Sequence, residues 1–289
     1  MKISINCLLI LALAMGSCNS FKKGASGISE LKGYDLIWAD EFENVGVPNP
    51  EFWSHENGFA RNNELQWYQP ANTSVSDGHL VIEGRRENVK NTSFDANSKD
   101  WRKNRKTAEY TSSSINTSGK FEFQFGVVEV RAKIDTASGM WPAIWTLGVS
   151  KPWPANGEID IMEFYKVDGK STILANAAWA HASIRAAWDD AKIPFTDLLA
   201  KDPDWPSKFH IWKMDWTSEY IKIYLDDELL NEVDLSNTIN PDGTNPFHQP
   251  HYLLLNLALG SNGGSLDDTP FPKQYLVDYV RVYQRLNDL

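Results

Sequence analysis

From Tyr34 onward the sequence consists of short segments in which apolar and polar residues alternate, and turn residues separate one segment from the next. Residues 80–83 follow the turn pair Asp77-Gly78, and residues 221–233 show a hairpin pattern around a central acidic turn. Alternation with a period of two places one set of side chains in a core and the other in solvent. Many strands at such short spacing restrict the chain to a sandwich or a barrel.

Three further segments support an all-β fold. Residues 252–259 are nearly all apolar, as in a central strand buried on both faces, whereas residues 276–283 alternate. In residues 120–134 the apolar positions change parity at Gly126, which indicates a bulge or a tight turn between two strands. The best candidate for an amphipathic helix is residues 186–200, and Pro194 interrupts it.

The composition excludes several classes of protein. Of the 289 residues, 42% are hydrophobic, which rules out a disordered chain and supplies a large core. The net charge of −10 makes nucleic acid a poor partner, because nucleic acid requires clustered Lys and Arg. The 12 tryptophans must either fill a core or line a binding surface.

The N-terminus resembles a bacterial lipoprotein signal. Residues 3–15 are an apolar run of signal-peptide length, and small residues precede Cys18 as in a lipoprotein processing site. We expect a signal peptide in residues 1–17, lipidation of Cys18, a tether in residues 18–30 and one domain in residues 31–289. The protein would be exported, to the periplasm or the cell surface, and would contact the membrane only through this anchor. A plain signal peptide is the alternative.

The cysteine content limits the chemistry of the mature domain. The two cysteines of the chain, Cys7 inside the apolar run and Cys18, both precede that domain. The domain itself therefore has no disulfide, no thiolate metal site and no cysteine nucleophile.

The most informative segment is residues 156–165, which carries three acids. Side chains alternate along a strand, so Glu158 and Asp160 share one face and Ile159 lies on the buried one. Strict alternation would bury Glu163, where a free carboxylate is costly. One extra residue at Ile161-Met162, a β-bulge, returns Glu163 to the face of the other acids.

Three like charges on one strand face repel one another, so chemistry explains them better than stability does. Asp160 raises the pKa of a neighbouring acid, which keeps one glutamate protonated near neutral pH. Glu158 and Glu163 could bring their carboxyl groups to the ~5–5.5 Å separation of a retaining glycosidase. The alternatives are a solvated acidic strand and a calcium site.

The order of several motifs resembles the family 16 glycoside hydrolases, in their laminarinase-like branch. Glu158-Ile-Asp160-Ile-Met-Glu163 is similar to the ExDxxE signature of that family, including the extra residue. Residues 38–42, 62–66, 139–145 and 277–283 resemble its opening strand, cleft loop, aromatic loop and last strand. The resemblance covers nearly the whole mature chain.

The resemblance implies a concanavalin-like β-jelly-roll sandwich with a concave substrate cleft. It implies that Glu158 is the nucleophile, that Glu163 is the acid and then the base, and that Asp160 orients and tunes the pair. The residues alone do not decide which glutamate attacks. The resemblance implies no cofactor for catalysis and a possible structural Ca²⁺ near Glu41, the Gly78 backbone and Asp278.

The candidate substrate-binding residues are aromatic, amide or charged groups near these motifs. Indole rings can stack on the apolar faces of sugars, and the other groups can bond to hydroxyls. The candidates are Trp141, Trp145, Trp67, Trp179, Arg131, Asn62, Asn63, Glu64 and Gln249. A core role is the alternative for Trp145, neutralisation of the acids for Arg131, and a turn for residues 62–64. The polar insert of residues 88–106 is expected to wall one end of the cleft.

The chain departs from the family pattern shortly after the acids. Many laminarinases have a His-x-x-x-His strand there, and Asn176 or Trp179 replaces the first histidine here. The expected activity is endo-hydrolysis of β-1,3-glucan by a monomer. The alternatives are mixed-linkage β-glucan and β-1,4-galactosidic chains, such as agar or mucin O-glycan. A non-catalytic glycan-binding lectin is the alternative from another class, although a lectin has no use for three crowded carboxylates.

Overall fold

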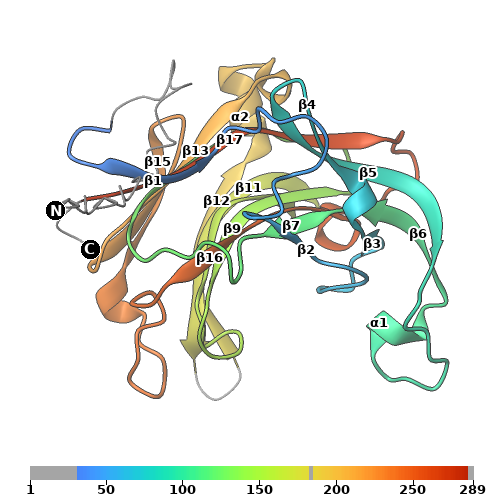
Figure 1. Ribbon diagram of the computed structural model, residues 1–289, viewed down its shortest axis with the longest axis horizontal. Coiled ribbons are helices and arrows are strands. Elements are labelled where there is room, and N and C mark those ends of the chain that lie inside the picture. Colours follow the sequence, from blue (N-terminus) through green and yellow to red (C-terminus); the bar gives the residue numbers. More distant parts are fainter. Residues whose placement is uncertain (1–30, 182–184, 286–289) are drawn as a thin grey trace, which may run out of the picture.

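The computed structural model describes residues 31–181 and 185–285, so Cys7, Cys18 and the predicted signal and tether lie outside it. The strands form two sheets that lie against each other (Figure 1). This confirms the predicted all-β sandwich. In the described ranges no helix is long and apolar enough to cross a membrane.

The larger sheet contains ten strands, in the order β15 (Glu228–Asp234), β14 (Tyr220–Leu225), β13 (His210–Trp216), β8 (Gly126–Lys133), β17 (Lys273–Gln284), β5 (His79–Lys90), β6 (Thr107–Ser112) and β3 (Gln66–Tyr68), with β1 (Asp35–Asp40) beside β17 and β4 (Thr73–Ser76) beside β5. The predicted hairpin in residues 221–233 is β14 and β15, and the turn pair Asp77-Gly78 joins β4 to β5.

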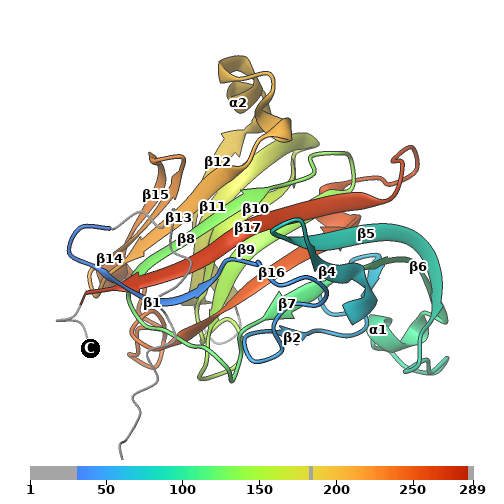
Figure 2. The same ribbon diagram turned by 45° about the horizontal axis from the view of Figure 1, so that its top comes forward.

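The smaller sheet contains seven strands, in the order β12 (Arg185–Pro194), β11 (Lys170–His181), β10 (Glu158–Val167), β9 (Met140–Gly148), β16 (His251–Leu259), β7 (Ser114–Asn116) and β2 (Ser54–His55). Two short helices, α1 (Trp101–Asn104) and α2 (Phe195–Lys201), and the 3-10 turns Pro70–Asn72, Trp205–Ser207, Leu235–Asn237 and Ser261–Gly263 complete the described elements. Figure 2 shows α2 at one end of the sandwich and α1 beside β6 at another.

The core lies between the two sheets, and β16 shows how it is built. Leu253, Leu255, Leu257 and Leu259 point into the main core cluster. Leu254 points the other way and packs in a small second cluster. The strand is thus buried on both faces, as its nearly continuous apolar sequence predicted.

The parity change at Gly126 is a bend at the start of one strand, β8, and not the predicted bulge or turn between two strands. Phe125 and Gly126 both have positive φ, 62° and 105°, and β8 begins at the glycine. A Cβ at position 126 would lie 2.2 Å from the Tyr283 carbonyl oxygen, so only glycine fits. Residues 120–125 form no named strand, and Phe123 makes one isolated bridge to His251.

The predicted helix in residues 186–200 is wrong over its first half. Residues up to Pro194 form β12, which pairs with β11 over its whole length. Only Phe195–Lys201 is helical, and Pro194 is its N-cap residue with an extended ψ of 127°. Pairing with the neighbouring strand overrode the helical preference of the alanines, and the proline separates the two elements.

Candidate active site

The predicted bulge in β10 is confirmed. On β11, Asn176 pairs with Asp160 and Leu174 pairs with Glu163. Two β10 residues, Ile161 and Met162, therefore lie opposite a single residue of β11. Ile159, Ile161, Met162 and Phe164 all belong to the main core cluster. The irregularity lets both residues of the Ile161-Met162 pair point inward, which leaves the three acids on the opposite face.

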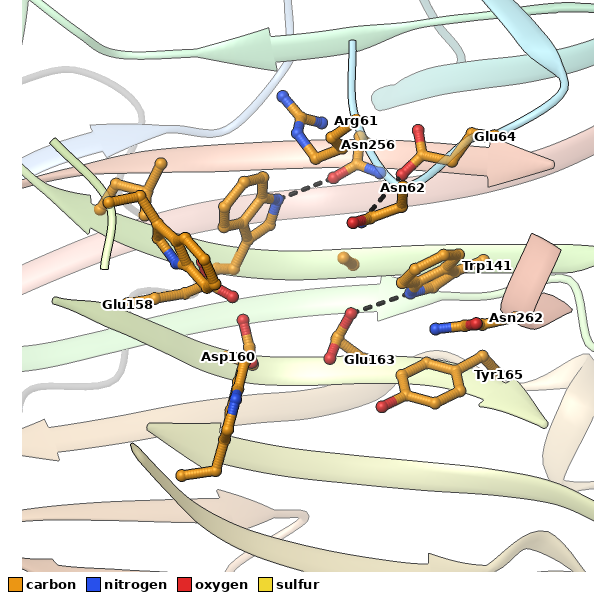
Figure 3. A pocket seen from close by; sticks show the side chains of 15 residues that line it. Arg61, Asn62, Glu64, Trp141, Glu158, Asp160, Glu163, Tyr165, Asn256 and Asn262 are labelled. Carbon is orange, nitrogen blue, oxygen red and sulfur yellow. Dashed lines mark hydrogen bonds between the residues drawn. The ribbon is translucent and has the colours of Figure 1, made fainter. Parts of the chain in front are cut away.

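The acids line a pocket of about 450 Å³ on this face of the smaller sheet (Figure 3). Its lining residues are Arg61, Asn62, Glu64, Trp141, Ala143, Trp145, Leu147, Trp153, Glu158, Asp160, Glu163, Tyr165, Trp188, Asn256 and Asn262. They come from β9, β10, β12 and β16 and from the loops after residues 60, 148 and 260. The pocket is therefore assembled from segments far apart in the sequence.

Two side chains hold Glu163 in place from opposite sides. Trp141 Nε1 donates to Glu163 Oε1 at 2.8 Å. Asn176 Nδ2 lies 3.4 Å from Glu163 Oε2 and also 3.4 Å from Asp160 Oδ2. Asn176, rather than Trp179, is thus the residue that faces the acids where the sequence pattern expected a histidine.

Burial raises the pKa of all three acids. Desolvation raises the pKa of Glu163 to about 8. The hydrogen bond from Trp141 opposes this rise, and the charges of Glu158 and Glu64 reinforce it. For Glu158 desolvation raises the pKa to about 7, while hydrogen bonds from Trp153 and Asp160 and the charge of Arg61 act against it. These bonds favour the ionised form of Glu158 over that of Glu163.

Asp160 is buried between the two glutamates, and its pKa is raised well above the usual range by burial and then by their charges. Its hydrogen bond with Glu158 raises the pKa of Asp160 and lowers that of Glu158. Asp160 is therefore the protonated partner, and its O–H group donates the hydrogen bond to the carboxylate of Glu158.

The loop before β3 contributes a fourth acid. Asn62 and Asn63 adopt positive φ values of 56° and 52°, a conformation that asparagine tolerates. This turn directs Glu64 inward, where Gln66 Nε2 donates to it at 2.7 Å and Asn62 Nδ2 at 3.3 Å. Burial raises the pKa of Glu64. Asn62 and Glu64 line the pocket as predicted, whereas Asn63 is exposed and lies outside the lining.

Trp141 and Trp145 line the pocket as predicted, but neither offers a free indole face. Their exposed fractions are 6% and 7%. Trp145 Nε1 donates to Asn256 Oδ1 at 2.7 Å, and the Arg61 guanidinium lies 5.0 Å from the centre of its ring. They are structural walls of the pocket more than stacking platforms.

Three more predicted binding residues do not line the pocket. Arg131 is on β8 of the other sheet and pairs with Asp278, so it neither bonds to a sugar in the pocket nor neutralises the three acids. Trp179 is three residues from Asn176 on β11, so its side chain lies on the opposite face of the strand and packs against the main core. Trp67 packs edge-on against Phe59 at 5.5 Å.

Gln249 supports the pocket from outside its lining. Its Nε2 donates to the Asn156 carbonyl at 2.8 Å, and its Oε1 accepts from the Ser150 backbone at 3.0 Å. It therefore fixes both ends of the loop that leads into β10.

The residues predicted for calcium do not fit a cation as they stand. Arg281 donates to both carboxylate oxygens of Glu41, at 2.7 and 2.8 Å, and Arg131 pairs with Asp278. Within the part of the chain that the structure describes, no group of three His, Cys, Asp or Glu side chains could hold a metal. The structural calcium stays a prediction.

Sequence analysis missed six polar or aromatic residues of the pocket: Arg61, Trp153, Tyr165, Trp188, Asn256 and Asn262. Alternation beyond Glu163 could have identified Tyr165, which is two residues further on the same face. Trp188 was not predicted because residues 186–200 were expected to form a helix, whereas it lies on strand β12. No local signal marks Asn256 or Asn262, which reach the pocket only through the fold.

Comparison with known proteins gives consistent matches. Residues 66–281 match the glycosyl hydrolases family 16. A beta-glucanase from Rhodothermus marinus is 33% identical over 269 residues, which cover 87% of this chain and 85% of that protein.

Two solved structures share the fold over most of the chain. The laminarinase catalytic domain from Thermotoga maritima has a TM-score of 0.73 and 32% identity, covering 89% of this chain and 100% of that one. A structure from work on endo-acting O-glycanases, which members of the human gut microbiota express to initiate mucin breakdown, has a TM-score of 0.79 and 34% identity. The match covers 89% of this chain and 92% of the chain in that structure.

Proposed function

The chain belongs to the glycosyl hydrolases family 16, and from this premise we propose that it is an endo-acting β-glycanase that cleaves a β-1,3-glucan. The observation that carries the proposal is the bulged strand β10, which presents Glu158, Asp160 and Glu163 together in one pocket. The beta-glucanase and laminarinase among the similar proteins support a glucan as the substrate.

We propose a retaining double displacement. The Glu158 carboxylate attacks the anomeric carbon while Glu163 donates its proton to the glycosidic oxygen, and the bond between that carbon and oxygen breaks. Glu163, now ionised, takes a proton from water, and the resulting hydroxide attacks the anomeric carbon. The ester bond to Glu158 then breaks, which restores both carboxyl groups to their starting forms.

The electrostatics of the pocket suit these roles. The first step requires Glu163 to be protonated, and burial with two acidic neighbours favours that form. It also requires Glu158 to be ionised, and the donors Trp153 and Asp160 favour that form. This difference between two neighbouring acids supports Glu158 as the nucleophile and Glu163 as the acid.

The substitution Glu158→Gln tests the proposal. An amide cannot form the glycosyl ester, so we expect hydrolysis of laminarin to fall by ~10³-fold or more while oligosaccharide binding persists. Product sizing measures turnover, and isothermal titration measures binding. Unchanged turnover in this variant would refute the triad mechanism. Binding of oligosaccharides by the wild type without any turnover would favour a lectin.

A second candidate substrate is a β-galactosidic chain of the mucin O-glycan type. Asn176 occupies the position where a histidine was expected, beside Asp160 and Glu163, and one similar structure comes from work on O-glycanases. A panel of laminarin, mixed-linkage β-glucan, agarose and mucin glycan separates the candidates. The substrate with the highest kcat/KM identifies the class.

We also propose that the protein is an exported monomer, lipid-anchored at Cys18, because a signal-like run precedes that cysteine. Metabolic labelling with a fatty acid tests this, since the label should be lost in Cys18→Ala. Catalysis is proposed to need no cofactor, because the carboxyl groups supply every proton transfer in the scheme. Removal of divalent cations by EDTA should then leave kcat unchanged.

A further inference from the structure

One segment of this acidic chain is strongly basic. Residues 90–106, which we call the basic arm, contain six Lys and Arg residues and two Asp residues. The arm therefore carries a net charge of +4, whereas the rest of the chain carries −14. A local excess of one sign attracts ligands of the opposite sign and raises their concentration at the surface.

The four lysines of the arm are available to a ligand. All four residues are exposed, and within the described part of the chain none of them forms an ion pair. Of the two acids of the arm, Asp100 is already bonded to the Arg102 guanidinium, at 2.8 Å. The fold therefore leaves four surface charges without a bonded counter-charge. These lysines are Lys90, Lys99, Lys103 and Lys106.

Hydrogen bonds inside the arm hold its backbone in a fixed arrangement. The buried Asn91 side chain donates to the carbonyls of Arg102 and Arg105, both at 2.8 Å. The Asp95 backbone N–H donates to the Lys103 carbonyl at 2.8 Å. The arm is thus closed on itself before any ligand binds, which reduces the entropy cost of binding.

The arm adjoins the pocket that holds the acids. It projects beyond the two sheets from the ends of β5 and β6 (Figure 1). Its Trp101 ring lies 5.8 Å from the Phe59 ring, and its Arg105 donates to the Glu64 carbonyl at 2.8 Å. Glu64 lines the pocket (Figure 3). A polysaccharide that extends from the pocket past the loop that carries Glu64 therefore meets the arm.

An anionic polysaccharide is repelled by most of this protein, because the chain outside the arm carries −14. The basic arm offsets that repulsion beside the pocket. We propose that the lysines of the arm bind anionic substituents, sulfate or carboxylate groups, on the substrate chain, outside the rings that occupy the pocket. This inference rests on the proposed endo-glycanase function and favours, among its candidate substrates, a chain that carries acidic groups.

The test compares the wild type with the triple variant Lys99→Gln/Lys103→Gln/Lys106→Gln on matched pairs of substrates. The pairs are sulfated laminarin with laminarin, and sialylated, sulfated mucin glycan with the same glycan after removal of either group or both. One exposed charge pair contributes little, so loss of three should raise KM on the acidic substrates by about tenfold in ~50 mM NaCl. The rise should disappear in ~0.5 M NaCl, because the screening length is then a few ångströms.

On the neutral member of each pair the triple variant should keep the wild-type kcat/KM, which also shows that it is folded. The glycan whose KM stops responding when sulfate or sialic acid is removed identifies the group that the arm binds. A wild-type KM for the triple variant on every acidic substrate, or an equal rise on the neutral ones, would overturn the proposal.

The matched control is Lys170→Gln/Lys201→Gln/Lys208→Gln, which removes the same charge from exposed positions outside the arm. It should keep the wild-type KM on the acidic substrates. A rise as large as that of the arm variant would mean that net charge, and not the arm, governs the affinity.

A binding measurement separates failure of the arm from failure of the proposed function. Titration of the same substrates into Glu158→Gln, with and without the three arm substitutions, does not depend on turnover. A weaker Kd for the acidic substrates in the arm variant supports the proposal even if the wild type hydrolyses none of them. Equal Kd values, or no binding by either, would reject it.

Sedimentation with phosphatidylglycerol vesicles tests an anionic membrane surface as the other partner of the arm. We expect the wild type and the triple variant to sediment equally. Binding to vesicles that is lost in the triple variant, together with an unchanged Kd for the acidic glycans, would assign the arm to the membrane and overturn the proposal.

Discussion

Trp141 and Trp145 stand four residues apart on the same strand and look equivalent in the sequence, yet their indole nitrogens meet different partners. Trp141 donates to the Glu163 carboxylate and Trp145 to the Asn256 amide, at 2.8 and 2.7 Å. A donor to a carboxylate favours its ionised form and lowers its pKa, whereas a donor to an amide does not. At the scale of the residue, the partner and not the residue type determines whether a tryptophan affects the pKa of an acid in the pocket.

The substitution Trp141→Phe should therefore shift the pH profile. Loss of the donor raises the pKa of Glu163 further, so the acid remains protonated to higher pH and the alkaline limb of kcat/KM moves upward. A hydrogen bond to a charged group is worth ~1.5 kcal/mol, which corresponds to about one pH unit. The measurement is kcat/KM against pH from 5 to 10.

Trp145→Phe is the matched control for this shift. It removes an indole donor from the same strand without touching a catalytic carboxyl, so the alkaline limb should stay in place. Equal shifts in both variants, or a downward shift in Trp141→Phe, would contradict the assignment of Glu163 as the acid.

At the scale of the element, the insert of residues 88–106 supports the pocket through the loop that carries Glu64. Arg105, at the end of α1, donates to the Glu64 carbonyl at 2.8 Å, and its guanidinium lies 4.8 Å from the Trp101 ring and 5.1 Å from the Phe59 ring. The insert was expected to wall the cleft. The residues of this insert do not line the pocket, and Arg105 instead fixes the backbone of a loop that does.

The substitution Arg105→Ala should loosen the loop that carries Asn62 and Glu64. We expect KM to rise by about three- to tenfold, on the order of 1 kcal/mol for a lost hydrogen bond to a carbonyl, with a small fall in kcat. Arg102→Ala is the control, because the guanidinium of Arg102 bonds to Asp100, the N-cap residue of α1, and not to the loop that carries Glu64. A KM as low as that of Arg102→Ala would show that the loop needs no support from α1.

At the scale of the whole molecule, the sandwich accommodates a group of acids that lowers its stability. Asp160 is 2% exposed and its pKa is raised, so the folded chain disfavours its ionised form. The unfolded chain ionises Asp at its ordinary pKa near ~3.9. As the pH rises above that value, ionisation stabilises the unfolded state, and the folded state gains no equal stabilisation until the pH reaches its own higher pKa.

The substitution Asp160→Asn should therefore stabilise the protein while lowering its activity. The gain should be small at pH 4 and largest at pH 8, because at pH 4 the unfolded state still holds nearly half of the proton and its ionisation adds little to its stability. Each unit of pKa shift is ~1.4 kcal/mol, or about 3–5 °C in Tm for a domain of this size. Scanning calorimetry at both pH values measures it.

Asp227→Asn is the control for this effect, since Asp227 lies on an exposed hairpin turn and adopts a positive φ of 68° that asparagine tolerates. Its Tm should differ little from the wild type at either pH. A lower Tm for Asp160→Asn at pH 8 would mean that the buried aspartate stabilises the fold.

The sequence by itself determined the fold class, the strand that carries the three acids, and the bulge in that strand. These follow from local rules, because alternation assigns each side chain to a face and a buried carboxylate is too costly to accept. Glu163 could be placed beside Glu158 without a structure for that reason. Strand pairing is non-local, and so the predicted helix near Trp188 was wrong, and Arg131 was assigned to the cleft although it lies on the other sheet.

Only the tertiary structure decided which aromatic and amide groups reach the acids. Trp188 lies in line with Glu158 because β10, β11 and β12 align in one register, and Asn256 arrives from a strand about a hundred residues later in the chain. Exposure likewise depends on what packs above each ring, which is why Trp145 is covered by Arg61 and Trp153 is open. A strand pattern fixes the direction of a side chain, but only the arrangement of the sheets and loops fixes its neighbours.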